Sequence, residues 1–180
     1  MGSPIVRSML STSPGHVSEH VLMPTPFESA SLNLKLFELR RDPVLREARA
    51  WFLTEFNPES FVELSALASG PRNAAFRMVL GYWDMASSLV SSGAIDGDAF
   101  RAAHSEIFLT FAKIYPFLQE LRSAAGEPEF CRHLEQVVLA APDVEAILTR
   151  RRAAALAAAE SRESVHTVRV PEPDHDAGER

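Results

Sequence analysis

The fold is decided by residues 71–92, PRNAAFRMVLGYWDMASSLVSS, which carry a wide apolar helical face. Apolar side chains recur there at spacings of three and four, which is the period of an α-helix. They form two adjacent rows: Phe76, Val79, Trp83, Ala86 and Val90 in one, and Met78, Tyr82, Met85 and Leu89 in the other. A surface helix needs only a narrower stripe, so we expect this helix at the centre of a helical bundle.

Prolines punctuate the chain on both sides of this central helix. Asp42-Pro43 and Asn57-Pro58 each pair a capping residue with a proline, which is a common start of a helix. The pattern predicts six further helices, at residues 31–41, 43–55, 58–69, 97–124, 128–140 and 143–161. Pro116 falls inside the longest one. Because proline removes a donor and its ring clashes with the preceding turn, we expect a kink near residues 112–116.

The segment 31–41 has the most ambiguous pattern of the seven. Leu32, Leu34 and Leu36 alternate as in a strand, whereas the helix formers around them favour a helix. No strand pattern persists elsewhere in the sequence. We therefore predict an all-α fold, a single helical bundle of six or seven helices with one long proline-kinked helix.

The two ends of the chain differ in composition from its middle. Residues 1–28 hold four prolines and many serines without any period, and residues 162–180 hold two prolines among mixed charges. Such segments bury too little apolar surface to offset the entropy of ordering them. We predict a disordered leader at 1–28, a helical domain at 29–161 and a disordered tail at 162–180.

The composition fits a globular cytoplasmic protein. Hydrophobic residues make up 46% of the chain, the formal net charge is −6, and Cys131 is the single cysteine, so no internal disulfide forms. The acidic balance argues against a nucleic-acid partner, although the run Arg150–Arg152 is a small basic alternative. No apolar run approaches the ~18–20 residues of a membrane helix, so we expect no membrane partner.

One polar stripe on the central helix is the best candidate for a binding site. Arg77, Gly81, Asp84 and Ser88 step by four, three and four and therefore share a face. Gly81 leaves a gap between Arg77 and Asp84, which are ~10.5 Å apart along the axis. The functional interpretation is a small-molecule or anion site formed by Arg77, Asp84, Arg122 and Tyr82. The structural alternatives are an ion pair, or close approach of another helix at Gly81.

Catalytic and metal-binding patterns are weak. His16 and His20 have the spacing of helical metal ligands, but their segment is rich in proline and serine and offers no third ligand nearby. A di-iron bundle needs Glu-x-x-His pairs, which the sequence does not contain. We predict that Cys131 is a packed, unreactive thiol and that His104 lies at the edge of the core. We predict no catalytic residue, no metal and no cofactor, and we lean against an enzyme.

From the central helix onward the chain resembles an uncharacterised bacterial family, a helical domain of unknown function. The residues that carry the resemblance are Arg77, Tyr82-Trp83-Asp84, Gly93 with Ile95-Asp96, Pro116, Arg122 and Leu134-Glu135. The likeness covers about residues 34–140, and Asp84 stands where the family pattern has glutamate. Some members carry an N-terminal membrane helix, for which this chain has no counterpart. The resemblance implies a helical bundle and no known activity.

Two functional hypotheses follow from these patterns. The first is a non-enzymatic interaction or regulatory protein that binds a protein partner or associates with itself, suggested by the double apolar row and the alanine-rich residues 153–159. The second is a small-molecule binding protein or enzyme with a pocket near Arg77 and Asp84. A concave, partly apolar cavity at these two residues would favour the second hypothesis.

Overall fold

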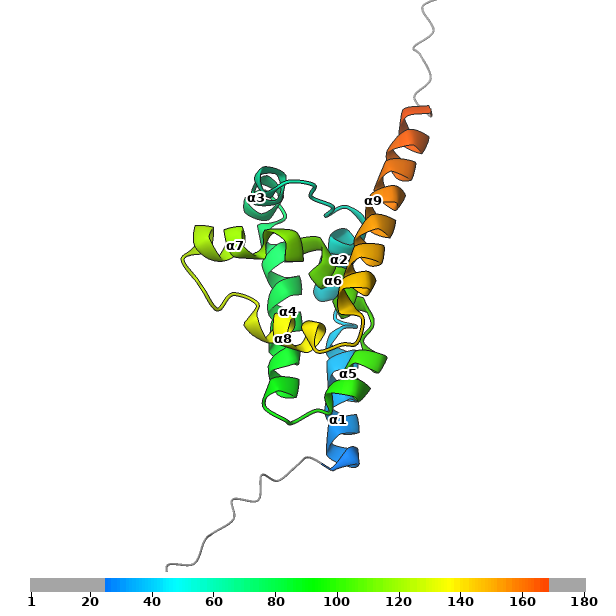
Figure 1. Cartoon of the computed structure of the whole chain (residues 1–180). Coiled ribbons are helices and arrows are strands. Elements are labelled where there is room, and N and C mark those ends of the chain that lie inside the picture. Colours follow the sequence, from blue (N-terminus) through cyan, green and yellow to red (C-terminus); the bar gives the residue numbers. More distant parts are fainter. Residues whose placement is uncertain (1–24, 169–180) are drawn as a thin grey trace, which may run out of the picture.

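The computed structural model describes residues 25–168, and all regular structure within them is helical (Figure 1). These residues form α1 (Pro26–Leu39), α2 (Pro43–Thr54), α3 (Phe61–Ser69), α4 (Asn73–Ser91), α5 (Gly97–Ala103), α6 (Glu106–Ile114), the 3-10 turn η1 (Tyr115–Phe117), α7 (Leu118–Ala125), α8 (Arg132–Leu139) and α9 (Val144–Val168). The predicted all-α fold is confirmed. None of the described helices is both long and apolar enough to cross a membrane.

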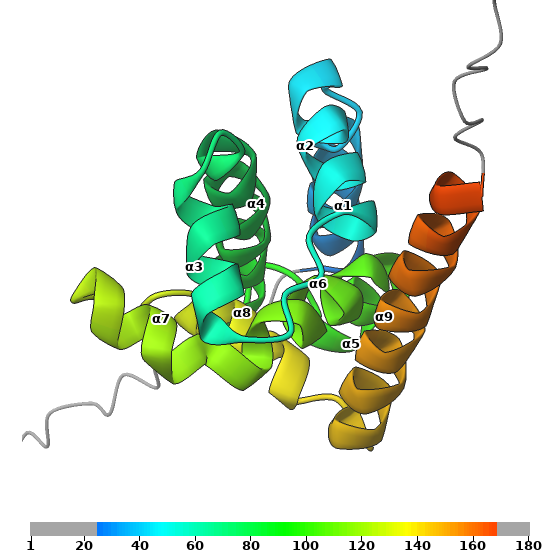
Figure 2. The same ribbon diagram turned by 90° about the horizontal axis from the view of Figure 1, so that it is seen from above.

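Helix α4 lies at the centre of the bundle, as its wide apolar face predicted. Helices α2, α3 and α8 all pack against it (Figures 1 and 2). The buried face follows the first apolar row and extends to Leu80 and Ser87 beside it. In the second row only Tyr82 is buried, while Met78 and Met85 are 37% and 42% exposed. The second row is thus only partly buried, with Leu89 packed against the core beside Tyr82.

The predicted long helix at residues 97–124 is three helices in the structure. Helix α5 ends at Ala103, because the ψ of 49° at the next residue, His104, leaves the helical region, and α6 begins at Glu106. At Pro116 the chain passes through the 3-10 turn η1 before α7. The local change at Pro116 was predicted, but the break at His104 was not, since neither Gly nor Pro marks it. The sequence pattern predicted seven helices, and the structure has nine α-helices within residues 25–168.

Both ends of the helical domain extend beyond the predicted boundaries. Helix α1 begins at Pro26, because Thr25 and Glu28 form a capping box that satisfies the first free backbone donors. Residues 26–28, assigned above to the leader, thus belong to α1. Helix α9 continues to Val168, which places residues 162–168 of the predicted tail in a helix. The remaining parts of both predicted tails lie outside the described residues.

An aromatic cluster joins α2 and the loop that follows it to α4. Phe52 and Phe56 stack with ring centroids 4.5 Å apart, and Phe56 lies 5.4 Å from the ring of Phe76 on α4. Trp83 is fully buried on the same helix. Such aromatic clusters bury large apolar areas and fix the relative positions of the helices that carry them. Helix α4 therefore provides a rigid support for the surfaces described next.

Candidate functional site

Helix α1 is apolar on two faces, and its own domain covers only one of them. On the inner face Leu36 is 3% exposed, and its carbonyl accepts a 2.8 Å hydrogen bond from the buried Tyr82 hydroxyl. On the outer face Phe27, Leu34 and Phe37 are 80%, 66% and 51% exposed. Large apolar side chains that gather on one exposed face commonly mark an interaction surface. The outer face of α1 is therefore a candidate interaction surface.

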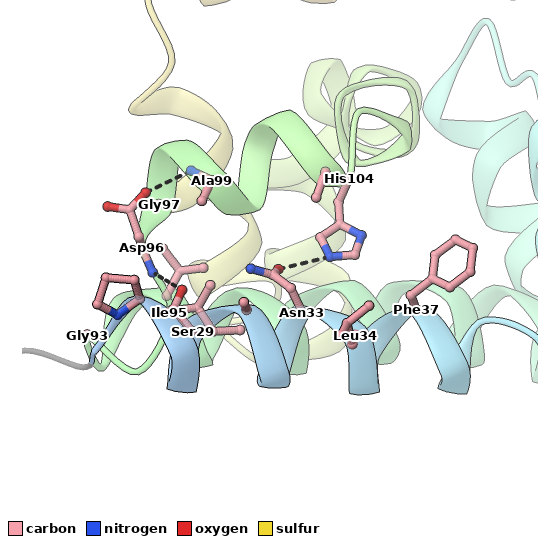
Figure 3. Close-up of a pocket in the computed structure, with 14 residues that line it drawn as sticks. Ser29, Asn33, Leu34, Phe37, Gly93, Ile95, Asp96, Gly97, Ala99 and His104 are labelled. Atoms are coloured by element: carbon pink, nitrogen blue, oxygen red, sulfur yellow. Dashed lines mark hydrogen bonds between the residues drawn. The ribbon is translucent and has the colours of Figure 1, made fainter.

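An open groove of about 910 Å³ runs between α1 and α5 (Figure 3). Leu34 and Phe37 form its wall on α1, and the small side chains Ala99 and Ala103 form its wall on α5. Figure 3 shows Phe37 rising from α1 on the side that faces α5. The groove thus continues the exposed apolar face of α1 onto the neighbouring helix.

The floor of this groove is a hydrogen-bonded histidine. His104 is 1% exposed, its Nε2 lies 3.1 Å from Oδ1 of Asn33, and its Nδ1 lies 3.4 Å from a guanidinium nitrogen of Arg40 (Figure 3). Arginine has only donors, so Nδ1 must accept and Nε2 carries the proton that is donated to Asn33. Burial, together with the charge of Arg40, lowers the pKa of His104. This neutral imidazole holds α1 against α5 and has no free nitrogen for proton transfer.

Beside His104, one carboxylate joins three helices. Glu106 at the start of α6 accepts a 2.7 Å hydrogen bond from Arg40 and two hydrogen bonds from Arg49 on α2. The side chains of all three residues are 14% exposed. Charge-assisted bonds at such depth are stronger and more directional than surface ion pairs. The members lie 57 and 66 residues apart in sequence, so no local pattern could reveal this cluster.

The predicted site beside Gly81 lies on another part of the molecule. Arg77, Gly81 and Asp84 line a second open groove of about 920 Å³, together with the loop between α7 and α8. A Cβ atom at Gly81 would contact nothing within 4 Å, which contradicts close approach of another helix there. Arg77 is exposed and forms no ion pair with Asp84 in the described structure. The two residues do share a concave surface.

Asp84 acts as a cap for α8. Its Oδ1 accepts a 2.9 Å hydrogen bond from the backbone N–H of Leu134, in the first turn of that helix. The residue in the N-cap position, Cys131, has a left-handed φ of 55° and offers no side-chain cap. Asp84 therefore supplies from α4 the acceptor that α8 lacks locally. Burial raises the pKa of the Cys131 thiol, which fits the predicted unreactive cysteine.

The other two predicted site residues have structural partners. Arg122 donates to Glu135 at 2.7 Å and to the Phe130 carbonyl at 3.1 Å, which ties α7 to α8. Tyr82 bonds to Leu36 on α1, and burial raises its pKa to about 12. Tyr82 does not line the groove beside Gly81. The structure thus brings Arg77 and Asp84 together and places Tyr82 elsewhere.

The run Arg150–Arg152 divides into exposed and engaged side chains. Arg150 and Arg151 are exposed. Arg152 donates to the Pro58 carbonyl at 2.7 Å, and its guanidinium lies 5.2 Å from the centre of the Phe117 ring. Arg152 therefore fastens α9 to the body of the bundle, which leaves only part of the run for other contacts.

A buried lysine caps α2 near the same place. Lys113, 1% exposed, donates to the carbonyls of Phe52 and Leu53 at 2.9 and 2.8 Å. These carbonyls belong to the last turn of α2, where a cation is favoured by the helix dipole. Burial is the main cause that lowers the Lys113 pKa to about 7. Lys113 from α6 thus holds two carbonyls at the end of α2, and arginines of α9 hold the carbonyls of Thr54 and Pro58 beyond them.

Comparison with known proteins supports the resemblance seen in the sequence. The model of a domain of unknown function, DUF4760, matches residues 26–140, which span α1 to α8 and exclude α9. No curated protein and no solved structure matches the chain. Because the family model covers more than half of the sequence, the chain belongs to the family of the domain of unknown function DUF4760.

Proposed function

We propose that this protein is a non-enzymatic interaction module that binds an apolar helical surface of a protein partner through the outer face of α1. The observation that carries the proposal is the two-sided apolarity of α1. Of its 14 residues only Ser29 and Leu36 are buried, although Phe27, Leu34 and Phe37 are as apolar as the residues of the core. Large exposed apolar side chains at helical spacing commonly mark an interaction surface.

The groove beside α1 supports binding better than catalysis. Its polar residues are already engaged by the protein: His104 bonds to Asn33 and Arg40, and Asp96 accepts a 2.8 Å hydrogen bond from the N–H of Ala99. The rest of its lining is mostly aliphatic and aromatic carbon. An apolar groove can bind the apolar face of another helix, which is a common mode of peptide recognition.

The setting that we propose is the cytoplasm of a bacterial cell. The single cysteine and the net charge of −6 support this location. We expect the partner to be a protein, either a second copy or a different chain, and we expect neither nucleic acid nor a membrane. The engagement of Arg152 with Pro58 supports the expectation of no nucleic acid, because it leaves only Arg150 and Arg151 of the short basic run exposed.

The groove beside Gly81 is a second candidate, for a small molecule. It is favoured by one observation, namely that Arg77 and Asp84 line the same concave surface. The carboxylates of Asp84, Glu127 and Glu129 line it beside the guanidinium of Arg77, and Arg132 pairs with Glu129 at 2.7 Å. The remaining small acidic excess fits a cationic or zwitterionic ligand better than an anion. Spermidine is a suitable probe. A rise in melting temperature with spermidine that Glu127→Gln reduces would support this site.

Site-specific photo-cross-linking tests the main proposal. Benzoylphenylalanine replaces Leu34 on α1 in one protein and Val62 on α3 in a matched control, since both side chains are exposed and apolar. The proteins are produced in bacterial cells, irradiated and separated by mass. We expect covalent protein adducts from position 34 and none from position 62. Equal yields at both positions, or no adduct from position 34, would contradict the proposal.

A further inference from the structure

The apolar side chains on the outer face of α1 have the spacing of a helix-pairing seam. Phe27, Ala30, Leu34 and Phe37 follow one another at three, four and three residues; we call these four residues the α1 stripe. This spacing is that of the a and d positions through which two helices interlock. We propose that two copies of this chain pair through the α1 stripe in antiparallel orientation. This inference rests on the proposed function and specifies the partner.

The order of side chains within the α1 stripe is complementary to itself. The stripe is symmetric about residue 32, so an antiparallel pair sets Phe27 opposite Phe37 of the second copy. It also sets Leu34 opposite the small Ala30 of the second copy. In both central pairs a large side chain, Leu34, thus meets a small one, Ala30, which favours close packing. A parallel pair would instead place Leu34 against Leu34 and leave Ala30 facing Ala30.

The groove between α1 and α5 provides room for the second helix. Leu34 and Phe37 line it on α1, and the small residues Gly97, Ala99 and Ala103 line it on α5, beside the capping residue Asp96. Small side chains let a helix axis approach closely, and helix axes pack about 8–10 Å apart. In a two-fold dimer each α1 would occupy the groove of the other copy. The same surface serves both chains, as an isologous interface demands.

Polar side chains border the α1 stripe and would form the rim of the interface. Ser31 and Glu38 lie along one edge, and Asn33 lies along the other. Glu38 is exposed and pairs only with Lys35 on its own helix at 3.0 Å. An apolar centre with a polar border is the usual anatomy of a protein interface.

The available area indicates a reversible dimer. At roughly 200 Å² for a buried aromatic side chain, the exposed fractions of Phe27 and Phe37, 80% and 51%, amount to about 260 Å² per copy. Leu34 and the alanines of the groove add to this. A standard interface buries about 800 Å² per partner, so we expect a small interface whose occupancy depends on protein concentration.

Sedimentation equilibrium of the full chain tests the pairing. Over about 1–500 µM, a range chosen for a small interface, we expect the average mass to rise from one chain towards two. Leu34→Glu should keep the mass at one chain, because it places charge at the centre of the seam. Val62→Glu, a matched change of an exposed apolar residue on α3, should behave like the wild type. A wild-type mass of one chain throughout would overturn the inference.

Cross-linking tests the orientation. Phe27→Cys and Phe37→Cys proteins are treated with a short bismaleimide, alone and mixed, with the wild type and its buried Cys131 as the background. Antiparallel pairing brings positions 27 and 37 of different copies together, whereas equal positions lie about 15 Å apart along the axis. We expect cross-linked dimers from the mixture only. Cross-links within each protein alone would overturn the antiparallel arrangement.

These outcomes are separable from the failure of the proposed function. If the chain stays monomeric while benzoylphenylalanine at position 34 captures a different protein, the self-pairing fails and the interaction surface stands. If the chain stays monomeric and position 34 captures nothing, both fail. Circular dichroism of Leu34→Glu checks that the fold is intact, so that loss of pairing is not loss of structure.

Discussion

Leu34 and Leu36 lie two residues apart on α1 and occupy opposite environments, since Leu34 is 66% exposed and Leu36 is 3% exposed. Along a helix, residues two apart point about 200° from one another, which places the two leucines on opposite faces. The domain packs against the face of α1 that carries Leu36 and leaves the face that carries Leu34 exposed to solvent. This difference separates the stability of the chain from its capacity to bind, and the two can be tested independently.

Leu36→Ala should destabilise the monomer and Leu34→Ala should not. Removing the buried side chain of Leu36 leaves a cavity, which costs about 2–4 kcal/mol, whereas truncating an exposed leucine changes stability by about 0.5 kcal/mol or less. Urea unfolding at low protein concentration, where the chain is monomeric, measures both values. Equal losses for the two variants would contradict the assignment of the two faces.

Asp84 should behave as a helix cap. Asp84→Ala removes the acceptor for the N–H of Leu134 and should cost about 1 kcal/mol, while Asp84→Asn keeps an acceptor and should restore most of it. Thermal unfolding of the three proteins measures the effect. A loss in Asp84→Asn as large as in Asp84→Ala would show that the charge of Asp84, and not its cap, is what the protein uses.

Acid should weaken the attachment of α1 through His104. Its pKa is lowered in the folded state, mainly by burial, so below pH 6.5 the unfolded chain binds more protons than the folded chain. Stability should therefore fall as the pH drops below about 6.5. In His104→Gln this part of the pH dependence should disappear, because an amide can make both hydrogen bonds without titrating. Urea midpoints at pH 5 and pH 7 provide the comparison.

Lys113 should make stability depend on pH on the alkaline side of neutrality. Its pKa is lowered from 10.5 to about 7 in the folded state, so between these values the unfolded chain holds more protons than the folded one. Stability should consequently rise with pH from about 7 to 9. Above that range, ionisation of Cys131 and Tyr82 in the unfolded chain acts in the other direction, since folding raises both pKa values. Lys113→Met should have a flatter profile between pH 7 and 9.

Much of the helical pattern could be predicted because its signals are local. The start at Asp42-Pro43 is confirmed, since Asp42 accepts from the N–H of Val44 at 2.9 Å. The start at Asn57-Pro58 is wrong, because α3 begins at Phe61 after the N-cap residue Ser60. The all-α class and the central position of α4 followed from apolar spacing in the same way. Caps and periods act over a few residues, so a single sequence carries them.

The start of α1 was missed although its signal is local. Thr25, Pro26 and Glu28 form a capping box with proline in the first turn, but the prolines and serines around them suggested a disordered leader. The alternation of Leu32, Leu34 and Leu36 also has a physical reason. A helix that is apolar on two opposite faces shows apolar residues two apart, which imitates the period of a strand.

The remaining differences depend on contacts between distant segments. The break after α5 places His104 against Asn33 and Arg40, which lie 71 and 64 residues away. Likewise, the stripe Arg77–Gly81–Asp84 was correctly placed on one face, but the use of Asp84 as a cap for α8 depends on a residue 50 positions away. No periodicity within a helix records such pairs, so only the structure reveals them.

Thiol accessibility at position 34 tests the central claim most directly, namely that a protein covers the outer face of α1. Leu34→Cys and Val62→Cys are labelled with a maleimide, first as dilute purified proteins and then inside cells, where Cys131 stays buried in both. We predict similar rates for the two dilute proteins and several-fold slower labelling of position 34 than of position 62 in cells. An unchanged ratio of the two rates in cells would contradict the claim.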